Sequence, residues 1–204
     1  MMLTAAEPRG KGLIALFIDG EQAVSIDAET YLKSGLKPGD DLTDERLHEL
    51  IEASDVRRAE QKAMYLLGYR SHSQKELAQK LSRTVSREAA DRAAEKMTEL
   101  GLVNDEEYAR SLARSMFGRK GFAASRVRME LMRKGIDREL AEQIAQEAEP
   151  DPREAIRQMI DRKYARCLDD EKGRRRTVAA LQRMGYRWDD IRSALHEFIT
   201  DEEE

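Results

Sequence analysis

Cysteine is nearly absent from this 204-residue sequence, which contains only Cys167. One cysteine cannot close a disulfide within the chain, so a disulfide-stapled fold is excluded. No apolar run reaches the roughly 18 residues that a membrane-spanning helix needs, so we expect no membrane partner. The opening residues MMLTAAEPRGKG lack the charged-then-apolar pattern of a signal peptide. We therefore expect a cytoplasmic protein.

Catalytic patterns are also lacking. The three histidines, His48, His72 and His196, lie far apart and share no metal-ligand spacing. The short stretch RGKG at Arg9 lacks the rest of a phosphate-binding loop. Most carboxylates fall at expected helix caps or on solvent-facing positions. We therefore expect no enzyme activity, no catalytic residue, no metal and no cofactor.

Aromatic residues make up 5% of the chain and charged residues 37%, with a net charge of -4. The charge is uneven: residues 1–54 carry 5 basic and 11 acidic side chains, and residues 201–204 are all acidic. The part between them has a net positive charge. Because screening limits electrostatic fields to about 8–10 Å, the overall negative sign does not exclude an anionic partner.

One convincing strand signal occurs near the N-terminus. In LIALFIDGEQAVSI, two apolar runs flank Asp19-Gly20, a dipeptide that suits a type I′ turn. We expect a hairpin of residues 13–18 and 21–26. An isolated hairpin is marginally stable in water, so it should pack on another element or gain a third strand.

From Thr43 onward the sequence predicts helix after helix. Ser73 and Glu76 form a capping box, Ser125 is expected to begin a helix that Gly135 ends, and Asp151-Pro152 suits a helix start. Paired helices recur about every 50 residues, each pair preceded by a third helix. We predict a mostly α fold of three tandem three-helix repeats in an elongated, curved array. The expected divisions are a head at 1–42, repeats at 43–103, 104–149 and 150–200, and an acidic tail at 201–204.

Basic residues recur at related places in the three repeats. Residues 110–138 hold nine basic and two acidic side chains, so we expect most of these charges to lack a local partner. By helical spacing, Arg126, Arg133 and Lys134 should project together, opposite the buried Leu131. The candidate binding face consists of Arg70, Lys75, Lys80, Arg119, Lys120, Arg126, Arg128, Arg133, Lys134, Arg174, Arg175, Arg176 and Arg183.

Three stretches in this order resemble the RecX family of recombination regulators: YRSHSQKELAQKL, LGLVNDEEYARSLARS and GFAASRVRMELMRKGI. The resemblance extends from about residue 12 to residue 199. Family positions match Arg70, Ser73, Glu76 and Leu77, then Asn104, Asp105 and Tyr108, then Arg126, Glu130, Leu131, Lys134 and Gly135. Two features depart from the family pattern: Ala123-Ala124 replaces the usual Gly-Pro, and the turn LSRTV is one residue short and lacks a glycine.

We expect a monomer. The resemblance implies a non-enzymatic protein that binds the RecA recombinase, especially its filament on single-stranded DNA. It implies binding in the filament groove or at its growing end, with inhibition of RecA ATPase, strand exchange and coprotease activity. Such a protein would serve recombination, DNA repair and the SOS response. Direct contact with DNA is left open.

Two other hypotheses for the function remain. Three-helix units with basic second helices also suit a transcriptional regulator of the helix-turn-helix type, which would need base-reading side chains at the start of its recognition helix. Arg126 and Arg128 are the candidates for that role. A purely structural helical scaffold would bind neither DNA nor filament.

Overall fold

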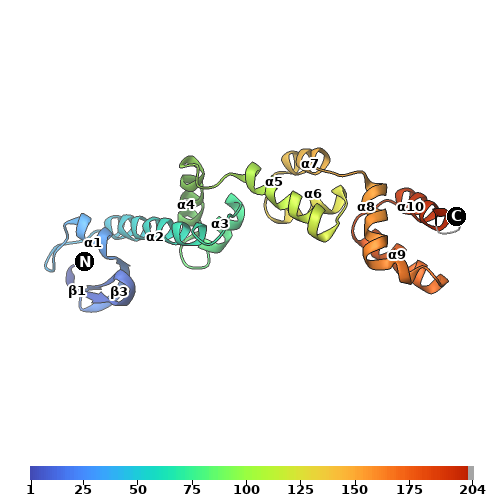
Figure 1. The fold of residues 1–204 in the computed structure, drawn as a ribbon. Helices are drawn as coiled ribbons and strands as arrows, with labels where there is room; N and C mark the ends of the chain where they lie inside the picture. The colour runs from blue at the N-terminus through green and yellow to red at the C-terminus, as the bar shows by residue number, and fades with distance from the viewer. Residues whose placement is uncertain (202–204) are drawn as a thin grey trace. The chain divides into compact units, whose positions relative to one another are not determined.

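The computed structural model describes residues 1–201, and two compact units divide the chain after Asn104. The N-terminal unit contains a small sheet and helices α1 to α4, and the C-terminal unit contains α5 to α10 (Figure 1). The expected mostly helical fold with a small N-terminal sheet is confirmed. Of the expected acidic tail, residues 202–204 lie outside the described residues.

The sheet is antiparallel, with the order β1-β2-β3. Its strands are β1 (Leu3–Arg9), β2 (Leu13–Ile18) and β3 (Glu21–Asp27). Asp19 and Gly20, which join β2 to β3, have φ angles of 50° and 90°, as the expected turn requires. The hairpin is therefore confirmed, and β1 supplies the third strand. Because β1 is an edge strand, it tolerates Pro8, which has no N–H to donate.

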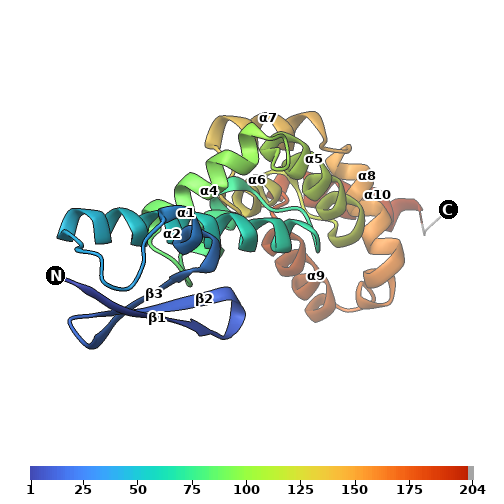
Figure 2. The same cartoon turned by 90° about the vertical axis from the view of Figure 1, so that its left-hand side faces the viewer.

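Helix α2 (Asp44–Leu67) begins where Thr43 Oγ1 accepts a hydrogen bond from the Arg46 N–H at 3.2 Å. Its first half packs on the sheet, which crosses beneath α1 (Ala28–Ser34) and α2 in Figure 2. Leu50 joins the core of the sheet, and Ser54 Oγ accepts a hydrogen bond from the backbone N–H of Asp27 at 2.8 Å. This contact fixes the helix against the end of β3.

The second half of α2 packs with α3 (Gln74–Leu81) and α4 (Arg87–Glu99) around a separate core. Helix α4 contributes mainly alanines, which permit a close approach between helices. The core consists of Ala59, Ala63, Leu77, Leu81, Ala90, Ala93, Ala94, Met97 and Val103. Ser73 Oγ accepts from the Glu76 N–H at 3.1 Å, so the predicted cap of α3 is present.

Two three-helix groups form the C-terminal unit. The first contains α5 (Asp105–Ser115), α6 (Ala124–Arg133) and α7 (Arg138–Glu147), and the second contains α8 (Pro152–Met159), α9 (Glu171–Arg183) and α10 (Trp188–Asp201). A π-helical turn follows α5 at Met116–Lys120, and another follows α8 at Ile160–Tyr164, before a 3-10 turn at Ala165–Cys167. Leu131 is fully buried in the first group and Leu181 in the second.

The two groups are joined by contacts between the start of α6 and the end of α9. The Ala123 N–H donates to the Met184 carbonyl at 3.0 Å, and Ser125 Oγ donates to the Gly185 carbonyl at 2.7 Å. We predicted that Ser125 begins this helix. The helix begins one residue earlier, at Ala124, and Ala123 is its N-cap residue. A Glu149 carboxylate oxygen accepts from the Ala124 N–H at 3.1 Å and so serves the helix start in place of a serine cap.

Thr177 is a buried polar residue of α9, in the second group. It lies 50 positions after Val127, and both side chains are buried at matching places in their groups. Within the described part of the chain, Thr177 Oγ1 has no hydrogen-bond partner. An unsatisfied buried hydroxyl costs about 1–3 kcal/mol, so the threonine is less favourable here than valine.

Replacing Thr177 by Val should therefore raise the free energy of unfolding by about 1 kcal/mol. The opposite change at the matching site, Val127→Thr, should lower it by about 1–3 kcal/mol. Urea denaturation followed by the fluorescence of Trp188, the single tryptophan, measures both. A destabilising Thr177→Val change would mean that the hydroxyl has a hydrogen-bond partner in solution.

Candidate anion-binding surface

Part of the basic segment 110–138 is paired with carboxylates. Arg126 and Arg133 both contact Glu130, with nitrogen-to-oxygen distances of 2.7 and 3.2 Å. Arg128 contacts Glu142 of α7 at 2.5 Å, and this contact lowers the pKa of the Glu142 carboxyl. Four of the nine basic residues of the segment therefore have a carboxylate partner, more than the carboxylates within the segment alone supply.

The reason is geometric. Arg110 pairs with Glu106 one helical turn earlier, at 2.9 Å, and with Glu147 at the end of α7, at 2.7 Å. Both carboxylates fall outside the counted segment, as does Glu142. A charge count along the sequence therefore underestimates the partners that helix packing brings to a basic stretch.

At the turn between α5 and α6, two cations lie over an aromatic ring. Lys120 Nζ is 5.4 Å and Arg126 Cζ 5.6 Å from the centre of the Phe122 ring. Such cation–π contacts hold positive side chains in place without neutralising them. Arg119 is exposed beside them. This turn thus keeps part of the positive character that the sequence indicates.

In the N-terminal unit, Arg70 forms a two-fold contact with Glu76: the guanidinium donates to both carboxylate oxygens at 2.9 and 3.1 Å. Lys75 is exposed, and Lys80 reaches inward to His72. Of the predicted residues in this unit, Lys75 is therefore the one most open to an external partner.

His72 is held in a single neutral form. Its side chain is 2% exposed; Lys80 Nζ donates to Nε2 at 2.9 Å, so Nδ1 carries the proton and donates to the Arg70 carbonyl at 2.8 Å. Burial and the neighbouring charge of Arg70 lower the pKa of the imidazole below its usual value. Its burial and its two hydrogen bonds, to the Arg70 carbonyl and to Lys80, favour a structural role.

Stability should therefore fall as the pH drops below about 6.5, because the unfolded chain binds a proton that the folded chain binds only at lower pH. His72 should lower the free energy of unfolding by up to about 1.4 kcal/mol for each pH unit of acidification, until the pH reaches the lowered pKa of His72 in the folded protein. Urea denaturation between pH 7.5 and 5.5 tests this on wild type, on His72→Asn and on the exposed control His48→Asn. If His72→Asn keeps the wild-type pH dependence, the assignment is wrong.

Helix α9 carries several cations without a carboxylate partner among residues 1–197. Arg175 pairs with Glu171, and Arg174 Nε donates to the Leu168 carbonyl at 2.7 Å. By contrast, Lys172, Arg176 and Arg183 are exposed, and none has an ion-pair partner among the side chains of residues 1–197. Their spacing of four and seven positions places all three along one side of the helix.

Comparison of α9 with α6 explains the difference. Arg176 and Arg183 lie 50 positions after Arg126 and Arg133, but the place of Glu130 is taken by Ala180. The carboxylate that neutralises two arginines on α6 is therefore missing from α9. An open hollow of about 480 Å³ lies along the start of this surface, lined by Glu171, Lys172, Arg175, Arg176 and Ala179.

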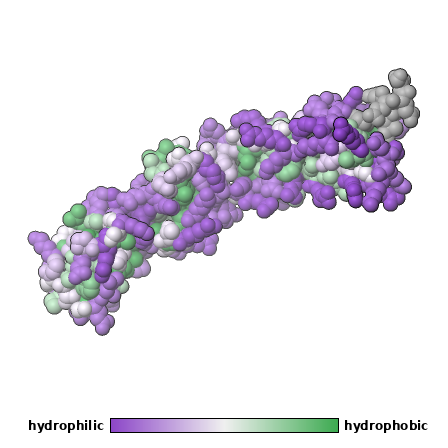
Figure 3. All heavy atoms as spheres, turned by 60° about the horizontal axis from the view of Figure 1, so that its bottom comes forward, coloured by the Kyte–Doolittle hydropathy of each residue, from purple (hydrophilic) through white to green (hydrophobic). Residues whose placement is uncertain are grey.

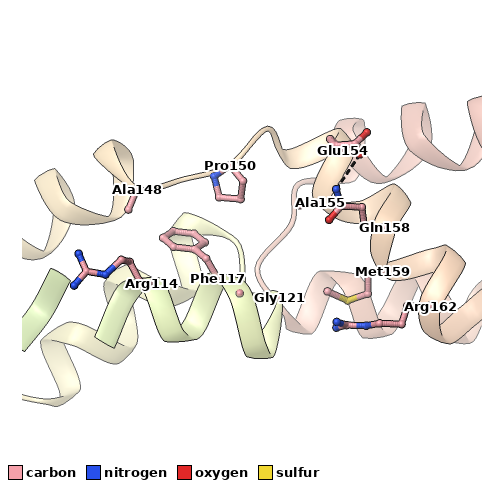
Figure 4. Close-up of a pocket in the computed structure, with 11 residues that line it drawn as sticks. Arg114, Phe117, Gly121, Ala148, Pro150, Glu154, Ala155, Gln158, Met159 and Arg162 are labelled. Carbon is pink, nitrogen blue, oxygen red and sulfur yellow. Dashed lines mark hydrogen bonds between the residues drawn. The ribbon is translucent and has the colours of Figure 1, made fainter. Parts of the chain in front are cut away.

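A second cavity, of about 490 Å³, lies between the two groups of the C-terminal unit. Figure 4 shows Phe117 directed toward Pro150, with Met159 entering from α8. Arg114 and Arg162 also line it, and Glu154 accepts a hydrogen bond from Gln158 at 2.9 Å. The walls are thus mainly apolar, with two arginines and one carboxylate.

Hydrophilic residues cover most of the face in Figure 3. Among the side chains of residues 1–197, no group of histidine, cysteine and carboxylate residues is placed to hold a metal ion. In the same range, no helix is both long enough and apolar enough to cross a bilayer.

Comparison with known proteins assigns the family. Models of the first, second and third three-helix domains of RecX match residues 59–97, 104–144 and 150–195. The "Regulatory protein RecX" of Caldanaerobacter subterraneus subsp. tengcongensis is 32% identical over 155 residues, which cover 72% of this chain and 76% of the relative.

A "Regulatory protein RecX" of Lactobacillus delbrueckii subsp. bulgaricus is 33% identical over 135 residues, covering 65% of this chain and 49% of that longer relative. A crystal structure of a regulatory protein RecX shares the fold, with a TM-score of 0.65 and 17% identity over 96% of this chain and 98% of the other. The predicted three-helix repeats and the resemblance are therefore confirmed, and the chain belongs to the RecX family of regulatory proteins.

Proposed function

We propose that this protein regulates the RecA recombinase by binding its filament on single-stranded DNA, and that it thereby inhibits ATP hydrolysis, strand exchange and coprotease activity. Family membership supports a regulatory role rather than an enzymatic one. The observation that carries the mode of binding is the row of Lys172, Arg176 and Arg183 on α9. Exposed cations without carboxylate partners are available to phosphates or to an acidic protein surface.

The proposed binding surface gives the main role to fewer residues than the candidate face predicted from the sequence. Arg70, Arg126, Arg128, Arg133 and Arg175 are held by carboxylates, so binding an anion there would compete with an existing ion pair. Lys75, Arg119, Lys120, Arg176 and Arg183 need no such exchange. We therefore place the main contact on α9, with the turn at Arg119 and Lys120 as a second contact.

A helix-turn-helix transcriptional regulator is less well supported. It would require Arg126 and Arg128, in the first turns of α6, to reach base edges. Their contacts with Glu130 and Glu142 direct both side chains to carboxylates instead.

The test is RecA ATP hydrolysis on single-stranded DNA, measured while this protein is added. We expect suppression at a small ratio of protein to RecA, because one molecule that caps or spans a filament affects many RecA subunits. If suppression requires enough protein to saturate the DNA, simple competition for DNA replaces the proposal. A protein that leaves hydrolysis unchanged at every ratio would not be a regulator of this kind.

A further inference from the structure

Two tyrosines at the end of α2 are exposed, whereas Leu77 and Leu81 of the same repeat are fully buried. Tyr65 is 56% exposed and Tyr69, just after the helix, is 73% exposed. Their ring centres are 4.9 Å apart, and the rings meet edge to face at 66°. The Tyr69 hydroxyl donates a hydrogen bond to the Tyr65 hydroxyl at 3.0 Å. The two rings therefore hold each other in a defined position on the surface.

A cation accompanies the pair. Lys62, one turn before Tyr65, places its Nζ atom 4.8 Å from the centre of the Tyr65 ring. Neither tyrosine belongs to the core of this repeat, which the helices complete with alanine, leucine and methionine side chains. Packing of the repeat thus does not account for two aromatic rings at these positions.

We propose that Tyr65 and Tyr69 form a stacking site for the bases of single-stranded nucleic acid, with Lys62 beside it to meet the phosphate backbone. Aromatic side chains bind bases without regard to sequence, because every base has a flat face, and a neighbouring cation follows the strand. The site rests on the proposed function in one respect, namely that the regulated filament contains single-stranded DNA.

A protein partner fits the pair less well. Tyrosines are also common at the centres of protein interfaces, but covering them with protein would bury the Lys62 ammonium as well. Burying an ammonium is costly unless a carboxylate accompanies it. A nucleic-acid strand supplies the base and the balancing phosphate in one molecule.

The experiment measures fluorescence anisotropy of labelled oligothymidylate and of an oligomer of equal length made of abasic units, without RecA. Both probes carry the same phosphates, so the ratio of their dissociation constants reports base contacts alone. Wild type should prefer oligothymidylate by about tenfold. Tyr65→Leu/Tyr69→Leu should abolish the preference, whereas Tyr65→Phe/Tyr69→Phe should keep it because the ring faces remain.

Equal binding of both probes by wild type would overturn the proposal, as would a Leu variant that keeps the preference. Failure of the proposed function is seen separately, since it concerns RecA ATP hydrolysis, which this experiment does not include. Melting followed by circular dichroism should show that both variants fold, because the substituted side chains are exposed.

Discussion

Replacing Gly185 by alanine should destabilise the C-terminal unit by about 2–4 kcal/mol. Gly185 has a φ angle of +98°. This backbone conformation is unfavourable for any residue that has a Cβ atom. Its position adds a second penalty: a Cβ atom would lie 2.6 Å from Ser125 Oγ and 3.0 Å from the backbone nitrogen of Arg126. Backbone atoms at the start of α6 cannot move aside without disturbing the contact between the two three-helix groups.

Gly101→Ala is the matched control. Gly101 also has a positive φ, +70°, but nothing lies within 4 Å of a Cβ atom there. Its substitution should therefore lower the free energy of unfolding only through the unfavourable φ angle, by about 1–2 kcal/mol. Urea denaturation measures both changes, by circular dichroism for the whole chain and by Trp188 fluorescence for the C-terminal unit. Equal losses in the two variants would show that the packing of Gly185 against α6 contributes nothing.

This contact illustrates what the sequence can and cannot predict. Gly185 lies directly after the C-cap residue of α9 and has a positive φ, as glycine commonly does at a helix end. Its second role, at the contact with Ser125, depends on a neighbour 60 positions earlier in the chain. Local capping rules describe one helix at a time, so they identify the glycine but not the residue packed against it.

The secondary structure was largely predictable because its signals are local. Asp19-Gly20, Ser73 and Asp151-Pro152 each act within a few residues, and each occurs where expected. Strand β1 was missed because LTAAEPR has neither alternation nor a long apolar run; its pairing with β2 forms it. A short edge strand of this kind is specified by its partner more than by its own residues.

The candidate surface was less predictable, for a related reason. Whether an arginine is free to bind an external anion depends on carboxylates one helical turn away or on another helix. Glu130 lies within the basic segment and neutralises two arginines, whereas Ala180 leaves its counterparts on α9 without a partner. Aligning the repeats of the sequence with one another reveals that Ala180 takes the place of Glu130, and a count of charges does not.

The largest effect on binding is therefore expected from α9. Changing Lys172, Arg176 and Arg183 to glutamine should weaken binding to single-stranded DNA by roughly ten- to hundredfold at moderate salt and relieve inhibition of RecA. Each lost phosphate contact removes a counterion-release contribution, so the slope of log affinity against log salt should fall by about 0.7 per contact. All three side chains are exposed, and surface substitutions usually change stability by less than about 0.5 kcal/mol each.

The matched variant changes Arg126, Arg128 and Arg133 to glutamine, which removes the same charge from residues that already have carboxylate partners. Its binding should weaken only slightly, because Glu130 and Glu142 already balance much of the positive charge there. Its stability should fall by about 0.2–1 kcal/mol per broken surface pair. Both variants are compared by melting, by oligonucleotide binding at several salt concentrations and by RecA ATP hydrolysis. If the α6 variant loses as much affinity as the α9 variant, ion pairing does not decide which cations bind, and the larger sequence-based face is the better description.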